Sequence, residues 1–288
     1  MPKSFKGDDK EMIIPTFLKW VGGKRKFLDK LDQNMPKEFG DYYEPFLGGG
    51  SVFFYMKQKF PEKKFTISDI NEDLINTYKD IRDNPYEIIG HLKSLKKLNS
   101  KEFYLKVRES FNKKRFSGIK RSAVFIYINK VCFNGIYRVN SKNEFNVPYG
   151  NYNNPEIFKE ETIMFASELL QGVKILCQDY SEINKSIKKG DFVYFDPCYD
   201  PLKKTSFANY TPDRFNDDDN IRMSNFVKEL KNKKVKFLFS NNLTPNVKRL
   251  YPRKEGFVYF KFEAFRSVGS KGEYREKVPE LLIKNYLF

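Results

Sequence analysis

The residue with the clearest chemical potential is an acid at the end of an apolar run. Asp196 opens the sequence Asp196-Pro-Cys-Tyr199, directly after the apolar run from Phe192 to Phe195. In an open α/β sheet, ligands bind beyond the carboxyl ends of the strands, so a carboxylate there can meet a substrate. Pro197 restricts the backbone, and Tyr199 offers a flat aromatic face. An ordinary Asp-Pro turn gives the same pattern, so this motif needs support from others.

Two further motifs are typical of a nucleoside site. The segment Glu44-Pro-Phe-Leu-Gly-Gly-Gly-Ser51 lies between a predicted strand and an apolar helix, and its glycines allow a sharp turn and a close approach to a ligand. It lacks the ending of a P-loop and the spacing of a dinucleotide fingerprint. Asp69 follows about twenty residues later, where an acid can accept the hydroxyls of a ribose. Asp69 or Asn71 would also serve as a plain helix cap, and the sequence leaves both roles open.

Two other segments combine aromatic and cationic side chains. Phe17-Leu-Lys-Trp-Val-Gly-Gly-Lys24 carries the only Trp of the chain, which would otherwise serve as a core residue. The segment from Phe133 to Gly150 has two apolar-alternating arms around a polar centre, which predicts a hairpin. Its tip is a plain surface hairpin or a reader of base edges in the major groove, for which the sequence offers Arg138, Asn140 and Lys142.

Short apolar runs alternate with helical patterns along most of the chain. The predicted strands are Tyr42 to Phe46, Lys64 to Ser68, Val173 to Cys177, Phe192 to Phe195, Val235 to Phe239, Gly256 to Phe262 and Leu281 to Leu287. The predicted helices between them are Lys24 to Asn34, Asn71 to Arg82 and Asp219 to Lys231. This alternation predicts an α/β sheet covered on both faces. Residues 84–170 interrupt it with a basic, mostly helical stretch and the hairpin, so we expect a core of residues 13–83 and 171–288 with an inserted lobe.

Charge and composition limit the classes of function. The 288 residues carry a net charge of +16, and the stretch from Lys93 to Lys130 holds twelve Lys or Arg against two acids. Such a surplus favours a polyanion as partner. Three scattered cysteines and a single histidine, His91, argue against a disulfide framework, a zinc site and histidine catalysis. The chain has no apolar run long enough to span a membrane, and we expect residues 1–12 to be a short disordered lead without a signal peptide.

Together these motifs resemble the DNA adenine methylase family, in its class with cofactor motifs first, a recognition lobe second and the catalytic motif third. The resemblance runs from about Phe17 to the end of the chain. It includes further segments: Asn134-Gly-Ile-Tyr-Arg, Phe145-Asn-Val-Pro-Tyr-Gly, Pro201-Leu to Phe207, Tyr210-Thr211, Arg266-Ser, and Arg275-Glu-Lys with Glu280-Leu-Leu. The family's catalytic motif is usually Asp-Pro-Pro-Tyr, and this chain departs from it with Cys198.

The resemblance implies a Rossmann-like methyltransferase sheet with S-adenosylmethionine as cofactor, S-adenosylhomocysteine as product and no metal. It implies a catalytic pocket formed by Asp196, Pro197 and Tyr199. The implied cofactor residues are Trp20, Lys24, Phe46, Gly48, Asp69, Asp179, Tyr180 and Asp196. The implied DNA contacts are Asn134, Arg138, Asn140, Lys142, Pro148, Lys271 and Arg275.

The expected activity is methyl transfer to the N6 amine of an adenine flipped out of double-stranded DNA, with GATC as the expected site. A cognate restriction endonuclease is a possible partner, and the bacterial cytosol or a phage-infected cell is the expected location. One alternative is a catalytically impaired DNA-binding protein in which Cys198 is the lesion. Others are a methyltransferase for cytosine N4 or RNA, and an oxidoreductase, which the missing dinucleotide fingerprint disfavours. The enzyme hypothesis requires Asp196 and the glycine turn to serve one cleft.

Overall fold

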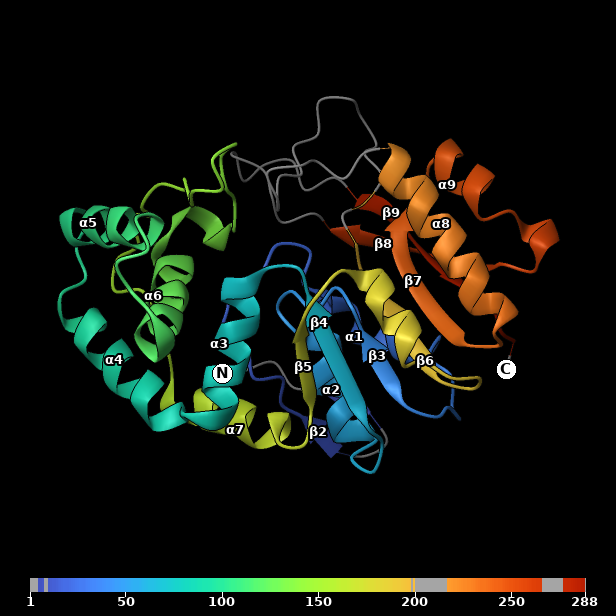
Figure 1. Cartoon of the computed structure of the whole chain (residues 1–288), viewed down its shortest axis with the longest axis horizontal. Helices are drawn as coiled ribbons and strands as arrows, with labels where there is room; N and C mark the ends of the chain where they lie inside the picture. Colours follow the sequence, from blue (N-terminus) through green and yellow to red (C-terminus); the bar gives the residue numbers. More distant parts are fainter. Residues whose placement is uncertain (1–4, 8–9, 198, 200–216, 266–276, 288) are drawn as a thin grey trace. The chain divides into compact units, whose positions relative to one another are not determined.

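A computed structural model describes residues 5–7, 10–197, 199, 217–265 and 277–287 of the protein (Figure 1). Within these residues, seven strands form the main sheet. The hydrogen-bonded strand order is β5-β4-β3-β6-β7-β9-β8. The strands are β3 (Tyr42–Glu44), β4 (Phe65–Asp69), β5 (Lys174–Cys177), β6 (Phe192–Phe195), β7 (Lys236–Asn242), β8 (Val258–Phe265) and β9 (Lys277–Lys284). The pairs β4–β5, β3–β6 and β6–β7 are parallel, whereas β9 runs antiparallel to both β7 and β8. The predicted α/β class, a Rossmann-like sheet, is confirmed.

The described residues fold as two compact units. The first unit comprises the described residues within 1–26 and 47–180, and the second those within 27–46, 181–199 and 217–287. The first unit holds the helices α2 (Ser51–Lys59), α3 (Glu72–Asp83), α4 (Pro85–Lys97), α5 (Lys101–Asn112), α6 (Gly118–Val131), η2 (Phe133–Gly135) and α7 (Glu160–Leu170). The second holds α1 (Leu28–Asp32), α8 (Asp217–Asn232), α9 (Pro245–Leu250) and η4 (Arg253–Glu255). The short helices η1 (Lys24–Phe27) and η3 (Tyr180–Lys185) lie where the chain passes between units.

Local sequence explains where the helices of the first unit begin. The Asn71 side chain accepts a hydrogen bond from the Leu74 backbone N–H and so caps α3, as one of the two sequence alternatives predicted. Ser100 caps α5 in the same way through the Phe103 N–H. Nearly every side of α6 is buried because it packs against α3, α4 and α5. The basic stretch expected after residue 84 is therefore a small helical cluster built around α6.

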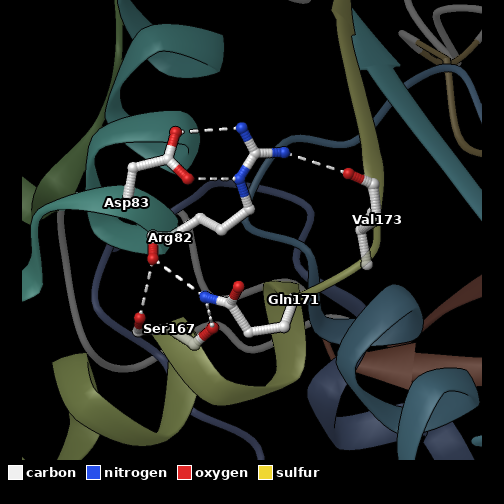
Figure 2. A network of polar contacts seen from close by, with 5 residues as sticks. All are labelled: Arg82, Asp83, Ser167, Gln171 and Val173. Carbon is white, nitrogen blue, oxygen red and sulfur yellow. Dashed lines mark hydrogen bonds and ion pairs between the residues drawn. The ribbon is translucent and has the colours of Figure 1, made fainter.

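A polar network ties the end of that cluster back to the sheet, at the junction of α3, α7 and β5 (Figure 2). The Arg82 guanidinium forms a fork with Asp83 and donates to the Val173 carbonyl, 3.1 Å away. The Arg82 carbonyl in turn accepts hydrogen bonds from the side chains of Ser167 and Gln171 on and just after α7. One residue thus holds the start of β5 and the end of α7 together, which fixes where β5 enters the sheet.

The hairpin expected within residues 134–150 is present in outline. Isolated bridges join Cys132 to Tyr149 and Val139 to Phe145 across the two arms. The turn at its tip is closed by hydrogen bonds from the Asn140 N–H to the Glu144 carbonyl and from the Asn143 N–H to the Asn140 carbonyl. Side chains of α5 bond to the backbone of the second arm: Tyr104 and Arg108 donate to the Val147 carbonyl, and Asn112 donates to the Phe145 carbonyl.

Three expectations about element limits are corrected. The helix expected from Lys24 to Asn34 is a 3₁₀ turn followed by five α-helical residues, Leu28–Asp32. The last strand begins at Lys277 and ends at Lys284, because residues 277–279 extend the ladder with β8. The N-terminal lead is not wholly irregular, since β1 (Phe5–Gly7) pairs antiparallel with β2 (Lys10–Met12). These residues lack the alternation of apolar and polar side chains that predicts a strand.

The core of the second unit surrounds β6. All four of its residues are buried, as expected for a central strand flanked on both sides by parallel neighbours. The Phe195 ring packs edge-on against Phe226 of α8 and Phe239 of β7, with ring centres 6.3 Å away in both cases. This packing fixes the carboxyl end of β6, from which Asp196 emerges. Among the described residues, no helix is both long and apolar enough to cross a membrane.

Candidate active site

The glycine turn of the first unit leads from β3 into α2. Its start is held by a hydrogen bond from the Leu47 N–H to the Ser68 carbonyl, 3.1 Å away, and its end by one from the Gly50 N–H to the Leu47 carbonyl. Gly48 and Gly50 have φ of +48° and +66°, in the left-handed region that glycine adopts without strain. The turn thereby delivers the N-terminus of α2 close to the end of β4.

Space as well as conformation requires glycine in this turn. A Cβ on Gly48 would lie 2.7 Å from Trp20 Nε1, and one on Gly50 would lie 2.5 Å from the Tyr78 hydroxyl oxygen. That hydroxyl donates a hydrogen bond to the Gly48 carbonyl across 3.1 Å. Trp20 and Tyr78 therefore fill the space that side chains in the turn would need, and the backbone of the turn becomes one wall of the site.

Asp69 joins the turn to the start of α3. Its Oδ2 accepts a hydrogen bond from the Gly48 N–H at 3.1 Å, and its Oδ1 accepts one from the Asn71 N–H at 3.0 Å. Burial raises the pKa of Asp69, and these backbone donors partly offset the rise. The Ile70 backbone is a third donor, so of the roughly four lone-pair sites of the carboxylate about one remains for a further hydrogen bond. Asp69 thus braces the turn and still has capacity for a ligand.

Ser68 provides a test of whether a nucleoside fits here. The residue is 1% exposed, and its Oγ has no hydrogen-bond partner within the described residues. Buried hydroxyls are normally satisfied, so an unsatisfied one at the carboxyl end of β4 suits a polar ligand that brings its own partner. Together with the remaining Asp69 lone pair and the close backbone of the turn, this donor set fits the ribose and adjoining groups of an adenosyl cofactor.

The other predicted cofactor residues of the first unit flank this centre. Trp20 packs on the turn through Gly48, as described above, and Lys24 is buried and donates to the Gly22 carbonyl at 2.7 Å. Asp179 is partly exposed two residues after β5, and the register that pairs Asp69 with Cys177 places Asp69 at the end of β4 and Asp179 just beyond the end of the neighbouring strand β5. Tyr180 follows it and is buried. The structure thus groups Trp20, Gly48 and Asp69 by direct contact and sets Asp179 beyond the adjacent strand.

In the second unit, Asp196 leaves the carboxyl end of β6. Its side chain is partly exposed, Pro197 is buried behind it, and Tyr199 is partly exposed. Phe46 also belongs to this unit and is partly exposed, with its ring centre 6.4 Å from that of Phe195. The catalytic motif expected from the sequence is therefore at the end of a buried central strand, where an α/β sheet binds its ligands.

A cluster of acids, tyrosines and one serine surrounds this motif. The Tyr42 hydroxyl donates to Glu44 Oε2 at 2.5 Å, and the Tyr194 and Ser240 hydroxyls lie 2.9 Å apart. The Tyr199 hydroxyl donates to Glu280 Oε2 at 3.3 Å. These groups come from β3, β6, β7, β9 and the motif itself. We call this set the acid–tyrosine cluster: Tyr42, Glu44, Tyr194, Asp196, Tyr199, Ser240 and Glu280.

Burial sets the protonation states in the acid–tyrosine cluster. It raises the pKa of Glu44 well above its ordinary value, an effect that the Tyr42 hydrogen bond reduces and the Asp196 charge increases. Burial also raises the pKa of Tyr199 well above its ordinary value, and the charges of Asp196 and Glu280 add to that rise. Glu44 therefore tends to be neutral, and Tyr199 keeps its hydroxyl proton. Both shifts favour the uncharged forms of Glu44 and Tyr199 beside Asp196.

The predicted DNA-reading side chains differ in how they are engaged. Asn140 uses both ends of its amide within the turn: Oδ1 accepts from the backbone N–H of Lys142 and Glu144, and Nδ2 donates to Glu144 Oε2. Lys142 is exposed at the tip, and Arg138 is exposed with its Nε donating to Asn146 Oδ1 at 2.8 Å. Asn140 thus builds the turn, whereas Arg138 and Lys142 project from the hairpin.

Asn134 and Pro148 lie at the base of the hairpin. Asn134 is exposed with φ of +54°, and its backbone N–H donates to the Tyr152 hydroxyl. Pro148 is exposed, and its carbonyl accepts from the Phe133 N–H. Lys271, Arg275 and Cys198 lie outside the described residues, as do the similar segments at 201–207, 210–211 and 266–276.

Several residues of the site carried no signal that sequence reasoning used. Glu44 stands in the glycine motif, yet only burial next to Asp196 distinguishes it from a surface acid. Ser240 and Glu280 lie on strands far along the chain, and Ser68 is an ordinary serine beside the acid that drew attention. Tyr137 of the hairpin stacks on Trp20, with ring centres 5.4 Å apart.

Comparison with known proteins agrees with this geometry. The model of a family described as D12 class N6 adenine-specific DNA methyltransferase matches residues 20–268. The type II methyltransferase M.MjaIII of Methanocaldococcus jannaschii is 45% identical, covering 96% of this chain and 100% of that protein. The type II methyltransferase M1.LlaDCHI of Lactococcus lactis is 41% identical, covering 95% and 96%. A DNA adenine methylase of Vibrio cholerae is 35% identical, covering 93% and 94%. The resemblance to DNA adenine methylases seen in the sequence is confirmed.

Proposed function

Since the chain belongs to the D12 class of N6 adenine-specific DNA methyltransferases, we propose that it methylates the N6 amine of an adenine flipped out of double-stranded DNA, in GATC sites, with S-adenosylmethionine as donor. One observation carries the proposal. Asp196 directly follows the buried central strand β6, at the end where an α/β sheet binds its ligands, beside Glu44, whose pKa burial raises well above its ordinary value. An anionic acceptor is what a weakly nucleophilic amine needs.

Residues of the first unit would hold the donor. S-adenosylmethionine supplies a methyl group on a positively charged sulfur and leaves as S-adenosylhomocysteine. Asp69 would accept a ribose hydroxyl with its remaining lone pair, and Ser68 Oγ would gain its missing partner. The backbone of the glycine turn would lie along the methionine part, flanked by Trp20 and Lys24, with Asp179 and Tyr180 as outer contacts. The role of these protein residues would be to position the donor for methyl transfer.

Residues of the second unit would prepare the adenine. The lone pair of its amine is delocalised into the ring, so the nitrogen must become more tetrahedral before it can accept a methyl group. The Asp196 carboxylate and the Pro197 carbonyl would accept its two hydrogens and favour that geometry. Asp196 is too weak a base to deprotonate the neutral amine in advance. It would take one proton as positive charge develops on the nitrogen, and then release that proton to water.

Flipping explains why an aromatic ring follows the acid. An amine paired inside a duplex cannot reach a methyl donor, so the base must leave the stack, at a cost of a few kcal/mol. Stacking on Tyr199 would return about 1–3 kcal/mol. Because its pKa is raised, the Tyr199 hydroxyl stays neutral and can go on donating to Glu280 while the ring serves as a platform.

The hairpin and the basic helices would bind the duplex. Exposed cations on α4 and α5 suit phosphate contacts, which position the protein without reading sequence. Arg138 and Lys142 would read base edges, and Asn140 would shape the turn that presents Lys142. Asn134, Pro148, Lys271 and Arg275 complete the proposed DNA contacts. Residues 84–170 would act as the recognition lobe, and residues 13–83 and 171–288 as the catalytic domain.

Mapping methylated adenines tests the whole proposal. The chain would be expressed in bacteria that lack GATC methylation, and N6-methyladenine in their DNA would be located by single-molecule sequencing. We expect modification of nearly every GATC. Methylation at another sequence would overturn the site assignment, and methylated cytosine would overturn the choice of base. Purified protein that binds GATC duplex but transfers no labelled methyl would instead identify the impaired DNA-binding alternative.

A protective role follows from the same activity. Two similar proteins are named type II methyltransferases, so we propose that this chain shields DNA from a restriction endonuclease with the same site, in bacterial cytosol or a phage-infected cell. Plasmid DNA recovered from expressing cells should resist an endonuclease that cuts only unmethylated GATC. Cleavage as complete as in control DNA would contradict this role.

A further inference from the structure

Trp20 is the point where the recognition hairpin meets the glycine turn. Its indole stacks on the Tyr137 ring, with centres 5.4 Å apart and planes inclined by 16°. Tyr137 is 9% exposed, and its ring also contacts those of Phe125 on α6 and Phe145 on the opposite arm of the hairpin. The ring that backs Trp20 is therefore anchored in the hairpin rather than in the sheet.

The same indole lies against the turn itself. A Cβ on Gly48 would be 2.7 Å from Trp20 Nε1, and one on Gly49 would be 3.0 Å from Trp20 Cβ. Burial raises the pKa of Tyr137 to about 12, and a hydrogen bond with the Asn71 side chain partly offsets the rise. Asn71 in turn donates its backbone N–H to Asp69. Tyr137 thus touches the proposed donor site at two places, Trp20 and the cap of α3.

The residue before Trp20 is bonded to the helical cluster. The Lys19 N–H donates to Asn129 Oδ1, and the Asn129 Nδ2 donates back to the Lys19 carbonyl, both across 2.8 Å. Gly135, at the base of the hairpin, leaves the space that the Lys19 side chain fills, since a Cβ there would be 2.3 Å from Lys19 Cβ. The backbone leading into Trp20 therefore follows any displacement of the hairpin base.

From these contacts we infer that Tyr137 is a positioning residue of the methyl-donor site, and that through Trp20 it couples hairpin engagement with DNA to donor affinity. The inference rests on the proposed function, which assigns the donor to the Trp20–Gly48–Asp69 site. When the hairpin is bound to DNA, the Tyr137 ring holds the Trp20 indole against the glycine turn, and the donor site has the geometry that binds the donor. When the hairpin shifts, the indole loses its support. Such coupling is reciprocal, so the donor strengthens DNA binding by the same factor.

Fluorescence of the single tryptophan tests this directly, because Trp20 is the only Trp in the chain. The full-length wild type and Tyr137→Leu would be titrated with S-adenosylhomocysteine, alone and with a saturating GATC duplex. In the wild type we expect the duplex to lower the dissociation constant. In Tyr137→Leu we expect the dissociation constant to rise about three- to tenfold, and the effect of the duplex to vanish. The emission of its Trp20 should also shift to the red, since the indole loses a neighbouring ring.

Two control variants separate stacking from general damage to the hairpin. Tyr137→Phe keeps the ring and should behave like the wild type within about twofold. Val139→Ala removes volume from a buried residue on the same arm, for which the structure gives no contact with Trp20, and should leave the donor dissociation constant unchanged. A loss in Val139→Ala as large as in Tyr137→Leu would overturn the assignment to Tyr137.

A measurement on the wild type keeps the inference testable should Tyr137→Leu fail to fold. The GATC duplex alone should change the Trp20 emission and its quenching by iodide, because the hairpin backs the indole. Unchanged emission and unchanged quenching would overturn the coupling, as would equal dissociation constants in wild type and Tyr137→Leu. A wild type that neither binds S-adenosylhomocysteine nor methylates adenine refutes the proposed function itself, and the inference falls with it.

Discussion

The glycine-turn site of the first unit and the acid–tyrosine cluster of the second are built in opposite ways. The first uses backbone: the Gly48 N–H is bonded to Asp69, and glycines leave room for Trp20 and Tyr78. The second uses side chains whose charge states depend on burial, above all Glu44. A site that holds a ligand by close approach needs side chains to be absent, whereas a site that moves a proton needs them present and tuned.

This contrast predicts different responses to substitution. In the glycine turn, adding a single carbon should lower stability most, because a Cβ has no room there and the backbone is in the left-handed region. In the acid–tyrosine cluster, removing the charge of Asp196 should do most harm to activity while the fold survives, because Asp196 is partly exposed after the end of β6. The four substitutions below test the contrast in descending order of expected effect.

Asp196→Ala should lower the single-turnover rate of methyl transfer by about a thousandfold or more, because it removes the acceptor for the amine hydrogens. DNA affinity in a gel-shift titration should stay within about threefold of the wild type, since binding depends on other residues. Asp196→Asn keeps an acceptor oxygen without the charge, so its methyl-transfer rate should lie between the rates of the wild type and of Asp196→Ala. Full activity in Asp196→Ala would end the proposed chemistry and the contrast with it.

Gly48→Ala should lower the free energy of unfolding by about 3 kcal/mol, because the new Cβ meets Trp20 Nε1 in a left-handed backbone conformation. Urea unfolding at pH 7 would measure the change. Gly90→Ala is a matched control: Gly90 lies within α4 with nothing within 4 Å of a new Cβ, so alanine should stabilise the protein by about 0.5–1 kcal/mol. Equal effects of the two substitutions would show that the turn is not tightly packed.

Glu44→Gln should become more favourable to stability as pH rises. The folded-state pKa of Glu44 is raised, so wild-type stability is fully present below the unfolded pKa and is lost as pH rises towards the folded pKa. Glutamine cannot ionise, so its advantage over glutamate should grow by about 1.4 kcal/mol per pH unit from near pH 4.5 upwards. Urea unfolding at pH 5, 6 and 7 would measure it. A difference that stays constant over this range would show that Glu44 is ionised in the fold.

Tyr199→Phe should have the smallest effect, a fall of less than about tenfold in the methyl-transfer rate, because the ring remains and one hydrogen bond to Glu280 is lost. Tyr199→Ala removes the ring as well and should cost a further ten- to hundredfold, about the value of stacking one base. The same single-turnover assay compares both variants. A larger loss in the Phe variant than this would assign the hydroxyl, rather than the ring, the main role.

The sequence predicted the fold class well because buried strands and their helices leave strong local patterns. All seven strands of the main sheet were expected, and β6 with both its limits. The predicted strand limits were wrong where a partner distant in the chain decides them. The strand β9 begins before its predicted start because its first residues pair with β8. The alternating arms and turn residues predict the hairpin, but no local pattern reports that side chains of α5 bond to the backbone of its second arm.

The features of the candidate site likewise divide into those that the local sequence predicts and those that depend on residues distant in the chain. Residue types and their spacing by themselves single out Asp196, Asp69 and the glycine turn as candidates, because the proposed chemistry needs a particular group at a strand end. Only tertiary structure decided that the Asn140 amide forms hydrogen bonds inside the turn, that burial raises the pKa of Glu44 in the acid–tyrosine cluster, and that Tyr137 stacks on Trp20. Burial and hydrogen-bond partners come from residues distant in the chain, so no reading of neighbouring residues can supply them.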